Sequence, residues 1–201
     1  MQAIGFNEHY GLQTAVLEKR KTMTRRQERG FDLLTETNHI FEDGVVKFYF
    51  EGSYHPTIIK PRYHVGEVLA IRQAYKDVFP DADFKMNTKG QFLTESAGWG
   101  NKMFIEAALM PHHIRITDIK VERLKDISRE DCMKEGILNK NSGNHRHKKA
   151  CPFYFAGGKH IWDNSYSTPR QAFAALIDKV SGKGTWERNQ FMPAYTFELI
   201  D

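Results

Sequence analysis

The sequence lacks the features that would assign it to several specialised classes of protein. Its 201 residues include only two cysteines, Cys132 and Cys151, which are too few for a disulfide framework. No apolar run approaches the roughly 20 residues of a membrane-spanning helix, and the first residues lack the charged head of a signal peptide. A nucleotide-binding glycine loop, a serine-hydrolase elbow and paired zinc knuckles are also missing. We therefore expect a soluble cytoplasmic protein without a cofactor.

The composition that is present suits one folded domain, residues 1–201. Apolar residues make up 40% of the chain, and 14 Phe, 8 Tyr and 3 Trp are spread along it, enough for a core at this length. Periodicity predicts a helix over 10–20, strands near 46–50, 68–71, 114–121 and 195–199, and helices after Ser128 and Thr168. This order predicts an α+β fold with a curved, mostly antiparallel sheet. Two less regular stretches, about 77–110 and 138–167, are predicted to be insertions.

Local signals define three of these elements more closely. Ile114 and Ile116 share one parity and Ile119 the other, which predicts a β-bulge near Thr117. Ser128 and Thr168 are each followed by sequences typical of a helix start, and glycines mark the expected helix ends.

Positive charge is concentrated near the amino terminus. Residues 18–29 hold six basic and two acidic residues, and this excess of four equals that of the whole chain, 29 basic against 25 acidic. Threonines, not acids, alternate with the bases in the core of the block, residues 20–26. Hydroxyls between cations are suited to contact an anion or to act as nucleophiles. The block therefore predicts a functional site and an anionic partner.

Four ordered segments carry a resemblance to a known family. They are Leu17–Arg26, Tyr63–Arg72, Ile116–Gly136 and the tail from Lys183 through Phe197. Together they resemble ASCH domains, closest to the longer phage and bacterial members, and ASCH domains have a PUA-like β-barrel fold. The family pattern Gly-x-Lys-x-x-Glu-x-Arg is matched here by Lys19, Lys21, Thr24 and Arg26, so the Gly and the Glu are replaced. Threonine in the Glu position is the pattern of small bacterial members that resemble 4-acetylcytidine amidohydrolases.

The resemblance implies Lys21, Thr24 and Glu135 as a catalytic set. A threonine hydroxyl needs a nearby base, and Lys21 can serve if burial and neighbouring cations lower its pKa. Thr24 would then attack an amide carbonyl, with arginine or backbone donors stabilising the oxyanion. Alternatively, Lys21 and Glu135 form an ordinary ion pair.

Whether the protein is an enzyme is left open by the sequence. A second hypothesis is that the protein is a non-catalytic module that binds RNA, a nucleotide or a modified nucleoside. The residues predicted to bind substrate or nucleic acid are Arg20, Arg25, Arg26, Arg72, Tyr75 and Trp186. Ribonuclease activity and a phage-related structural role are further alternatives.

Metal binding is a weaker interpretation. His145, His147, Cys151 and His160 lie close in sequence, but their spacing matches no common closed zinc site, and adjacent lysines and arginines oppose a cation. A solvated basic loop is the better interpretation, so no metal is predicted.

Overall fold

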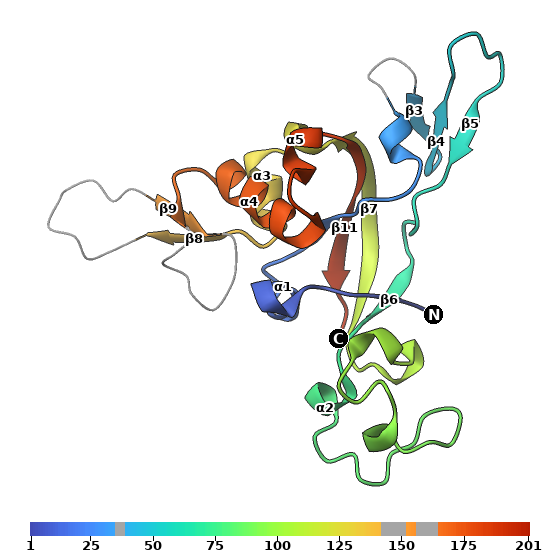
Figure 1. Cartoon of the computed structure of the whole chain (residues 1–201), viewed down its shortest axis with the longest axis vertical. Coiled ribbons are helices and arrows are strands. Elements are labelled where there is room, and N and C mark those ends of the chain that lie inside the picture. The colour runs from blue at the N-terminus through green and yellow to red at the C-terminus, as the bar shows by residue number, and fades with distance from the viewer. Residues whose placement is uncertain (35–38, 142–151, 156–164) are drawn as a thin grey trace, which may run out of the picture.

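The computed structural model describes residues 1–34, 39–141, 152–155 and 165–201 (Figure 1). Its central sheet has five strands, in the order β1 (Gln2–Ile4), β6 (Val68–Ile71), β7 (His113–Arg123), β11 (Phe191–Leu199) and β2 (Met23–Arg25). The β1–β6 pair is parallel and the other pairs are antiparallel. This confirms the prediction of a mixed α+β protein with a mostly antiparallel sheet.

Two three-stranded sheets extend from this centre. One contains β3 (His39–Glu42), β4 (Val45–Phe48) and β5 (Thr57–Ile59), and the other contains β8 (Leu138–Asn141), β9 (Pro152–Phe155) and β10 (Ser165–Tyr166). No closed barrel is found among the described strands, so the PUA-like barrel stays a prediction.

The two long strands of the central sheet contain the predicted bulge. Thr196 and Phe197 of β11 pair with Asp118 and Ile116 of β7, so the register shifts at Thr117. The extra residue changes the parity of the strand, and therefore Ile116 and Ile119 are both buried although they differ by an odd number.

Helices cover one side of β7 and β11, as Figure 1 shows. They are α1 (Leu12–Leu17), α3 (Arg129–Lys134), α4 (Pro169–Ser181) and α5 (Thr185–Arg188). Further 3₁₀ turns are at Glu8–Tyr10 and Leu124–Asp126, and one at Phe31–Leu33 lies beside β3. The Ser128 hydroxyl accepts a hydrogen bond from the Asp131 amide and the Thr168 hydroxyl one from the Gln171 amide, which confirms both predicted helix starts. The main apolar core lies between these helices and the sheet.

The predicted first insertion forms a lobe at the lower end of the molecule in Figure 1. It contains α2 (Tyr75–Val78) and 3₁₀ turns at Leu93–Glu95, Lys102–Phe104 and Ala107–Leu109. Tyr75, Ala82, Leu93 and Met110 are buried in its own apolar cluster. The second predicted insertion contributes strands β8 to β10, and Tyr154 of β9 is buried in the main core. Within the described ranges, no helix is long and apolar enough to cross a membrane.

Candidate functional site

The basic block turns from the end of α1 into the edge strand β2. Lys19 adopts a left-handed conformation with φ of 58°, which ends the helix, and the Lys21 amide donates to the Ala15 carbonyl. Strand β2 then pairs with β11, with Thr24 opposite Tyr195. This turn directs the Lys21 side chain into the protein, where only 3% of it is exposed.

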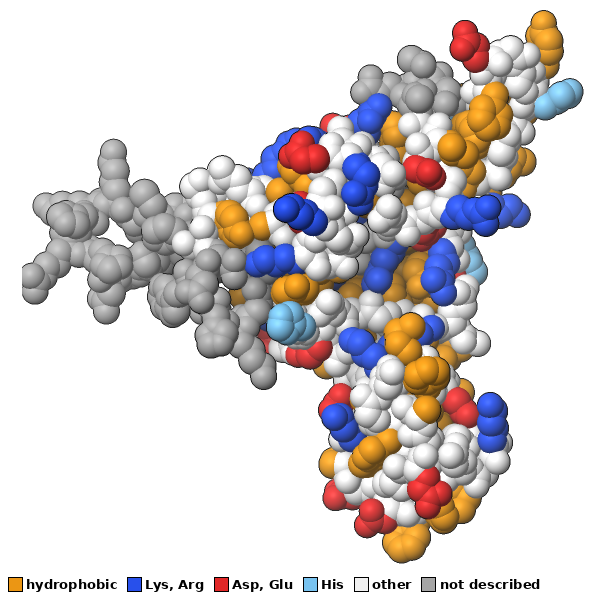
Figure 2. All heavy atoms as spheres, viewed as in Figure 1, with side chains coloured by type: hydrophobic (Ala, Val, Ile, Leu, Met, Phe, Trp, Pro, Cys, Tyr) orange, Lys and Arg blue, Asp and Glu red, His pale blue; other side chains and the backbone are white. Residues whose placement is uncertain are grey.

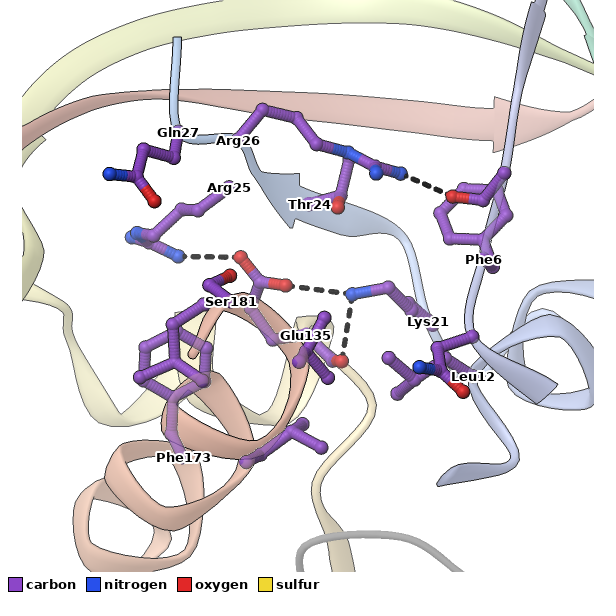
Figure 3. Close-up of a pocket in the computed structure, with 15 residues that line it drawn as sticks. Phe6, Leu12, Lys21, Thr24, Arg25, Arg26, Gln27, Glu135, Phe173 and Ser181 are labelled. Carbon is purple, nitrogen blue, oxygen red and sulfur yellow. Dashed lines mark hydrogen bonds and ion pairs between the residues drawn. The ribbon is translucent and has the colours of Figure 1, made fainter. Parts of the chain in front are cut away.

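Lys21 and Glu135 are in direct contact, as the resemblance implied. The Lys21 Nζ lies 2.7 Å from the Glu135 Oε2 and also donates to the backbone carbonyls of Glu135 and Met23, at 2.8 and 2.7 Å. Figure 3 shows this amine held below β2, between α1 and the end of α3. Three acceptors match the three N–H donors of an ammonium group, so this arrangement is that of a charged lysine.

Arg25 completes the charge network around Glu135. Its side chain is 1% exposed, donates to Glu135 Oε1 at 3.0 Å and is ion-paired with Glu122. Asp131 lies 3.8 Å from the same guanidinium and 2.5 Å from Lys120. Lys21, Arg25 and Lys120 thus face three acids, Glu122, Asp131 and Glu135, and the half-exposed Lys134 adds a contact to Asp131 at 3.6 Å. Arg25 was predicted to bind substrate or nucleic acid, but its guanidinium is already ion-paired with these carboxylates.

Burial and pairing act in opposite directions on the two central bases. Burial lowers the pKa of the Lys21 ammonium, while the Glu135 carboxylate opposes that shift. Burial also works to lower the pKa of Arg25, but Glu135 and Glu122 outweigh it and leave this pKa raised. Of the two, Lys21 is therefore the group whose proton can be removed.

A pocket of about 290 Å³ opens beside this network. It is lined by Gly5, Phe6, Asn7, Leu12, Lys21, Thr24, Arg25, Arg26, Gln27, Glu135, Phe173, Leu176, Ile177, Val180 and Ser181. One wall is polar and comes from β2 and its flanks, and the opposite wall is the apolar stripe of α4. The Arg25 guanidinium lies 5.7 Å from the centre of the Phe173 ring in that wall.

Thr24 lies in the same pocket, and Figure 3 shows its hydroxyl on the side of Lys21 and Glu135. The residue is 4% exposed. No side-chain hydrogen bond of Thr24 to any part of the described chain is found, and this includes Lys21. The hydroxyl is therefore available to a ligand in the pocket.

Arg26 also lines the pocket, on the side of the amino-terminal segment. Its guanidinium donates to the Gly5 carbonyl at 2.7 Å and stands 5.4 Å from the centre of the Phe6 ring. Its Nε is buried with no acceptor among the described residues, and the same holds for the Nε of Arg25. Both N–H groups are thus buried donors without an acceptor in the part of the chain that the structure describes.

The other predicted binding residues lie outside the pocket. Arg20 is paired with Glu18 at the surface, and Arg72 lies beside Gly5, with its Nε 3.4 Å from the Ala3 carbonyl. Tyr75 is 1% exposed in the core of the lower lobe, and its hydroxyl accepts from the Glu106 amide, so its ring has no free face for a base. Trp186 packs edge-on against Phe173 behind the pocket wall, between Arg170 and Lys125.

A metal centre finds no support in the described part of the chain, where no group of three or more potential ligands converges. The candidates His145, His147, Cys151 and His160 lie outside the described residues.

Comparisons with protein-family models, with curated proteins and with solved structures found no match. The site therefore has to be interpreted from its own geometry.

The acids Glu122 and Asp131 and the apolar stripe of α4 were not predicted from the sequence to belong to the site. A signal for the stripe existed, because Phe173, Leu176 and Ile177 recur at helical spacing. The acids carried no such signal, since their partner Arg25 is about 100 positions away in the sequence.

Proposed function

We propose that the pocket binds a modified nucleoside and hydrolyses an amide on its base, as an amidohydrolase acting on a substrate such as 4-acetylcytidine. The observation that carries this proposal is the buried Lys21–Glu135 contact of 2.7 Å in a pocket that also holds the unpartnered Thr24 hydroxyl. A nucleophile and a lysine whose pKa burial lowers are the minimum for covalent amide hydrolysis.

The size and lining of the pocket favour a single nucleoside over a folded nucleic acid. A volume of about 290 Å³ is near the lower end of small-molecule sites. An apolar wall from α4 suits the face of a base, while the Thr24 hydroxyl suits its polar edge. The charge of Arg25 and Lys21 is neutralised internally, so the centre of the pocket suits a neutral group.

In the proposed reaction, the Thr24 oxygen attacks the carbonyl carbon of the amide. Lys21 in its neutral form accepts the hydroxyl proton, and the positive side chains of Arg25 and Arg26 in the pocket wall stabilise the oxyanion. The C–N bond then breaks, and the proton held by Lys21 passes to the departing amine. Water hydrolyses the resulting Thr24 ester and releases acetate, which restores the hydroxyl.

This scheme requires Lys21 to lose a proton first. Its three donors are all in use, so the structure corresponds to a resting state with a charged lysine. A ligand that fills the pocket removes water and further disfavours the ammonium. That proton passes to solvent before the reaction, and Lys21 takes one up again from solvent after it.

We also propose that the chain is an ASCH domain with a PUA-like fold. Support comes from the two segments that carry the resemblance most directly, because they supply Lys21 and Glu135 and these side chains meet. The bulged β7–β11 pair is consistent with a strongly curved sheet.

The test is release of acetate from 4-acetylcytidine by the purified protein and two matched variants. Thr24→Val removes the hydroxyl but keeps the branched shape, and it should abolish release, whereas Thr24→Ser should retain activity. Lys21→Met should abolish release while circular dichroism stays native. Undiminished activity in Thr24→Val would refute Thr24 as the nucleophile.

A second candidate, binding without chemistry, is favoured by one observation. Lys21 has no hydrogen bond to Thr24 and has all its donors occupied by other groups, as a purely structural lysine would. In that case, the wild-type protein would bind the nucleoside but release no acetate, and Thr24→Val would bind equally well.

A further inference from the structure

A second group of cations surrounds the amino-terminal segment that forms one side of the pocket. Arg26 donates to the Gly5 carbonyl, Arg72 to the Ala3 carbonyl and Lys102 to the Phe6 carbonyl. Each cation comes from a different part of the chain, namely the end of β2, the end of β6 and the lower lobe. The three side chains therefore converge on four consecutive residues, two of which line the pocket.

Two further observations relate these cations to the same segment and to one another. The Arg72 Cδ lies 3.8 Å from the position that a Cβ on Gly5 would occupy. Burial lowers the pKa of Lys102, and the nearby charge of Arg26 adds to that effect. In Figure 2, Lys and Arg side chains are visible where the lower lobe joins the main body.

The charge of this group is not neutralised in the way that the central network is. Lys21, Arg25 and Lys120 each have a carboxylate partner within 3.0 Å. In the described chain, Arg26, Arg72 and Lys102 form no ion pair with a carboxylate; they donate to neutral carbonyls, and Arg72 also contacts the Met103 sulfur. Glu135 and Glu28 act on Arg26, and Glu8 and Asp77 on Lys102, without direct contact.

Three clustered positive charges with no carboxylate in contact repel one another, and an anion between them would reduce that cost. Guanidinium and ammonium groups together are suited to phosphate, because Arg supplies paired donors and Lys a point charge. Arg26 belongs both to the pocket and to this group, and its buried Nε has no acceptor in the described chain. An anion bound by these three cations would therefore be part of the ligand that occupies the pocket.

We infer that the substrate carries a phosphate group, which Arg26, Arg72 and Lys102 hold at the rim while its base enters the pocket. This inference rests on the proposed nucleoside site and makes the first insertion part of substrate recognition, through Lys102. Two sources share this chemistry, a nucleoside 5′-monophosphate and a phosphodiester within a short RNA strand.

The experiment compares the binding of cytidine and cytidine 5′-monophosphate by titration calorimetry at low salt. The phosphate should tighten binding at least about tenfold, since charge-assisted hydrogen bonds to phosphate are roughly twice as strong as neutral ones. Lys102→Met should remove most of this gain without weakening the binding of cytidine itself. Lys102→Arg should restore it, and inorganic phosphate should compete only with the nucleotide.

Lys89→Met is the matched control, because Lys89 is an exposed lysine of the same lobe for which only its backbone amide forms a hydrogen bond. It should leave both affinities unchanged. A trinucleotide with a central cytidine and unphosphorylated ends distinguishes the two sources. If the strand is the ligand, this trinucleotide binds better than the mononucleotide, and its affinity falls with salt at a log–log slope of about −0.7 for each phosphate held.

The outcomes separate the two proposals. Equal affinity for cytidine and its monophosphate would overturn the phosphate site but leave hydrolysis of 4-acetylcytidine intact. Phosphate-dependent binding without acetate release would refute the hydrolase and keep the phosphate site. If neither ligand binds and no acetate is released from 4-acetylcytidine, both proposals are wrong.

Discussion

Replacing Glu135 by glutamine should destabilise the protein more than replacing its partner Lys21 by methionine. Glu135 is the only carboxylate in contact with Lys21 within the described chain, and it is 4% exposed. Glu135→Gln therefore leaves a buried ammonium without a counter-charge, although Arg25 keeps its contact with Glu122. Breaking a buried pair in this way costs about 3–5 kcal/mol.

Lys21→Met has a smaller expected cost, because Glu135 keeps its ion pair with Arg25 at 3.0 Å. The loss is that of the donors to two backbone carbonyls, about 1–3 kcal/mol, and it is partly offset because no ammonium is then desolvated. The double variant should be less destabilised than the sum of the two single variants, since the groups are in contact.

Urea denaturation followed by tryptophan fluorescence measures these differences as free energies of unfolding. Glu42→Gln is the control, because it breaks an exposed pair with Lys47 and should leave the unfolding midpoint unchanged. A loss below about 0.5 kcal/mol for Glu135→Gln, the range of ordinary surface substitutions, would show that the buried pair is not formed in solution.

Two further predictions concern pH and helix capping. Burial lowers the pKa of Lys21 from its usual 10.5. Between the pKa of the folded state and 10.5, the unfolded chain therefore binds more protons than the folded protein. In this range the free energy of unfolding of the wild type should rise with pH relative to that of Lys21→Met, by at most about 1.4 kcal/mol per pH unit. Urea midpoints of both proteins from pH 7 to 10 measure this, and parallel curves would contradict it. Ser128→Ala removes the acceptor of the Asp131 amide and should lower the free energy of unfolding by about 1 kcal/mol in the same assay. Ser128→Asp should retain stability, and equal losses in both variants would argue against the cap.

The elements with strong local signals were predictable from the sequence. Strand β6 has the predicted bounds, and the parity change in β7 indicated its bulge, because side chains of a strand must alternate between its faces. Ser128 and Thr168 act through hydrogen bonds to amides three residues away, so their role is visible in a short window of sequence.

The features that depend on distant residues were not predictable in this way. Strand β1 has three residues and is defined by its parallel partner β6, about 65 positions later. Arg25 was predicted to bind substrate or nucleic acid because its neighbours in sequence are basic, while the three acids that surround it lie between positions 122 and 135. Tyr75 is buried because the lower lobe folds over it, which its local sequence does not indicate.

The pocket joins residues 5–7 to residues 173–181, so more than 160 residues of chain separate its two sides. Contacts between such distant segments form late in folding, because closing a long loop costs conformational entropy. A molecule bound there would tie α4 to the amino-terminal segment and would protect the native state by mass action. Occupancy of the site would then slow proteolysis at both ends of the chain together.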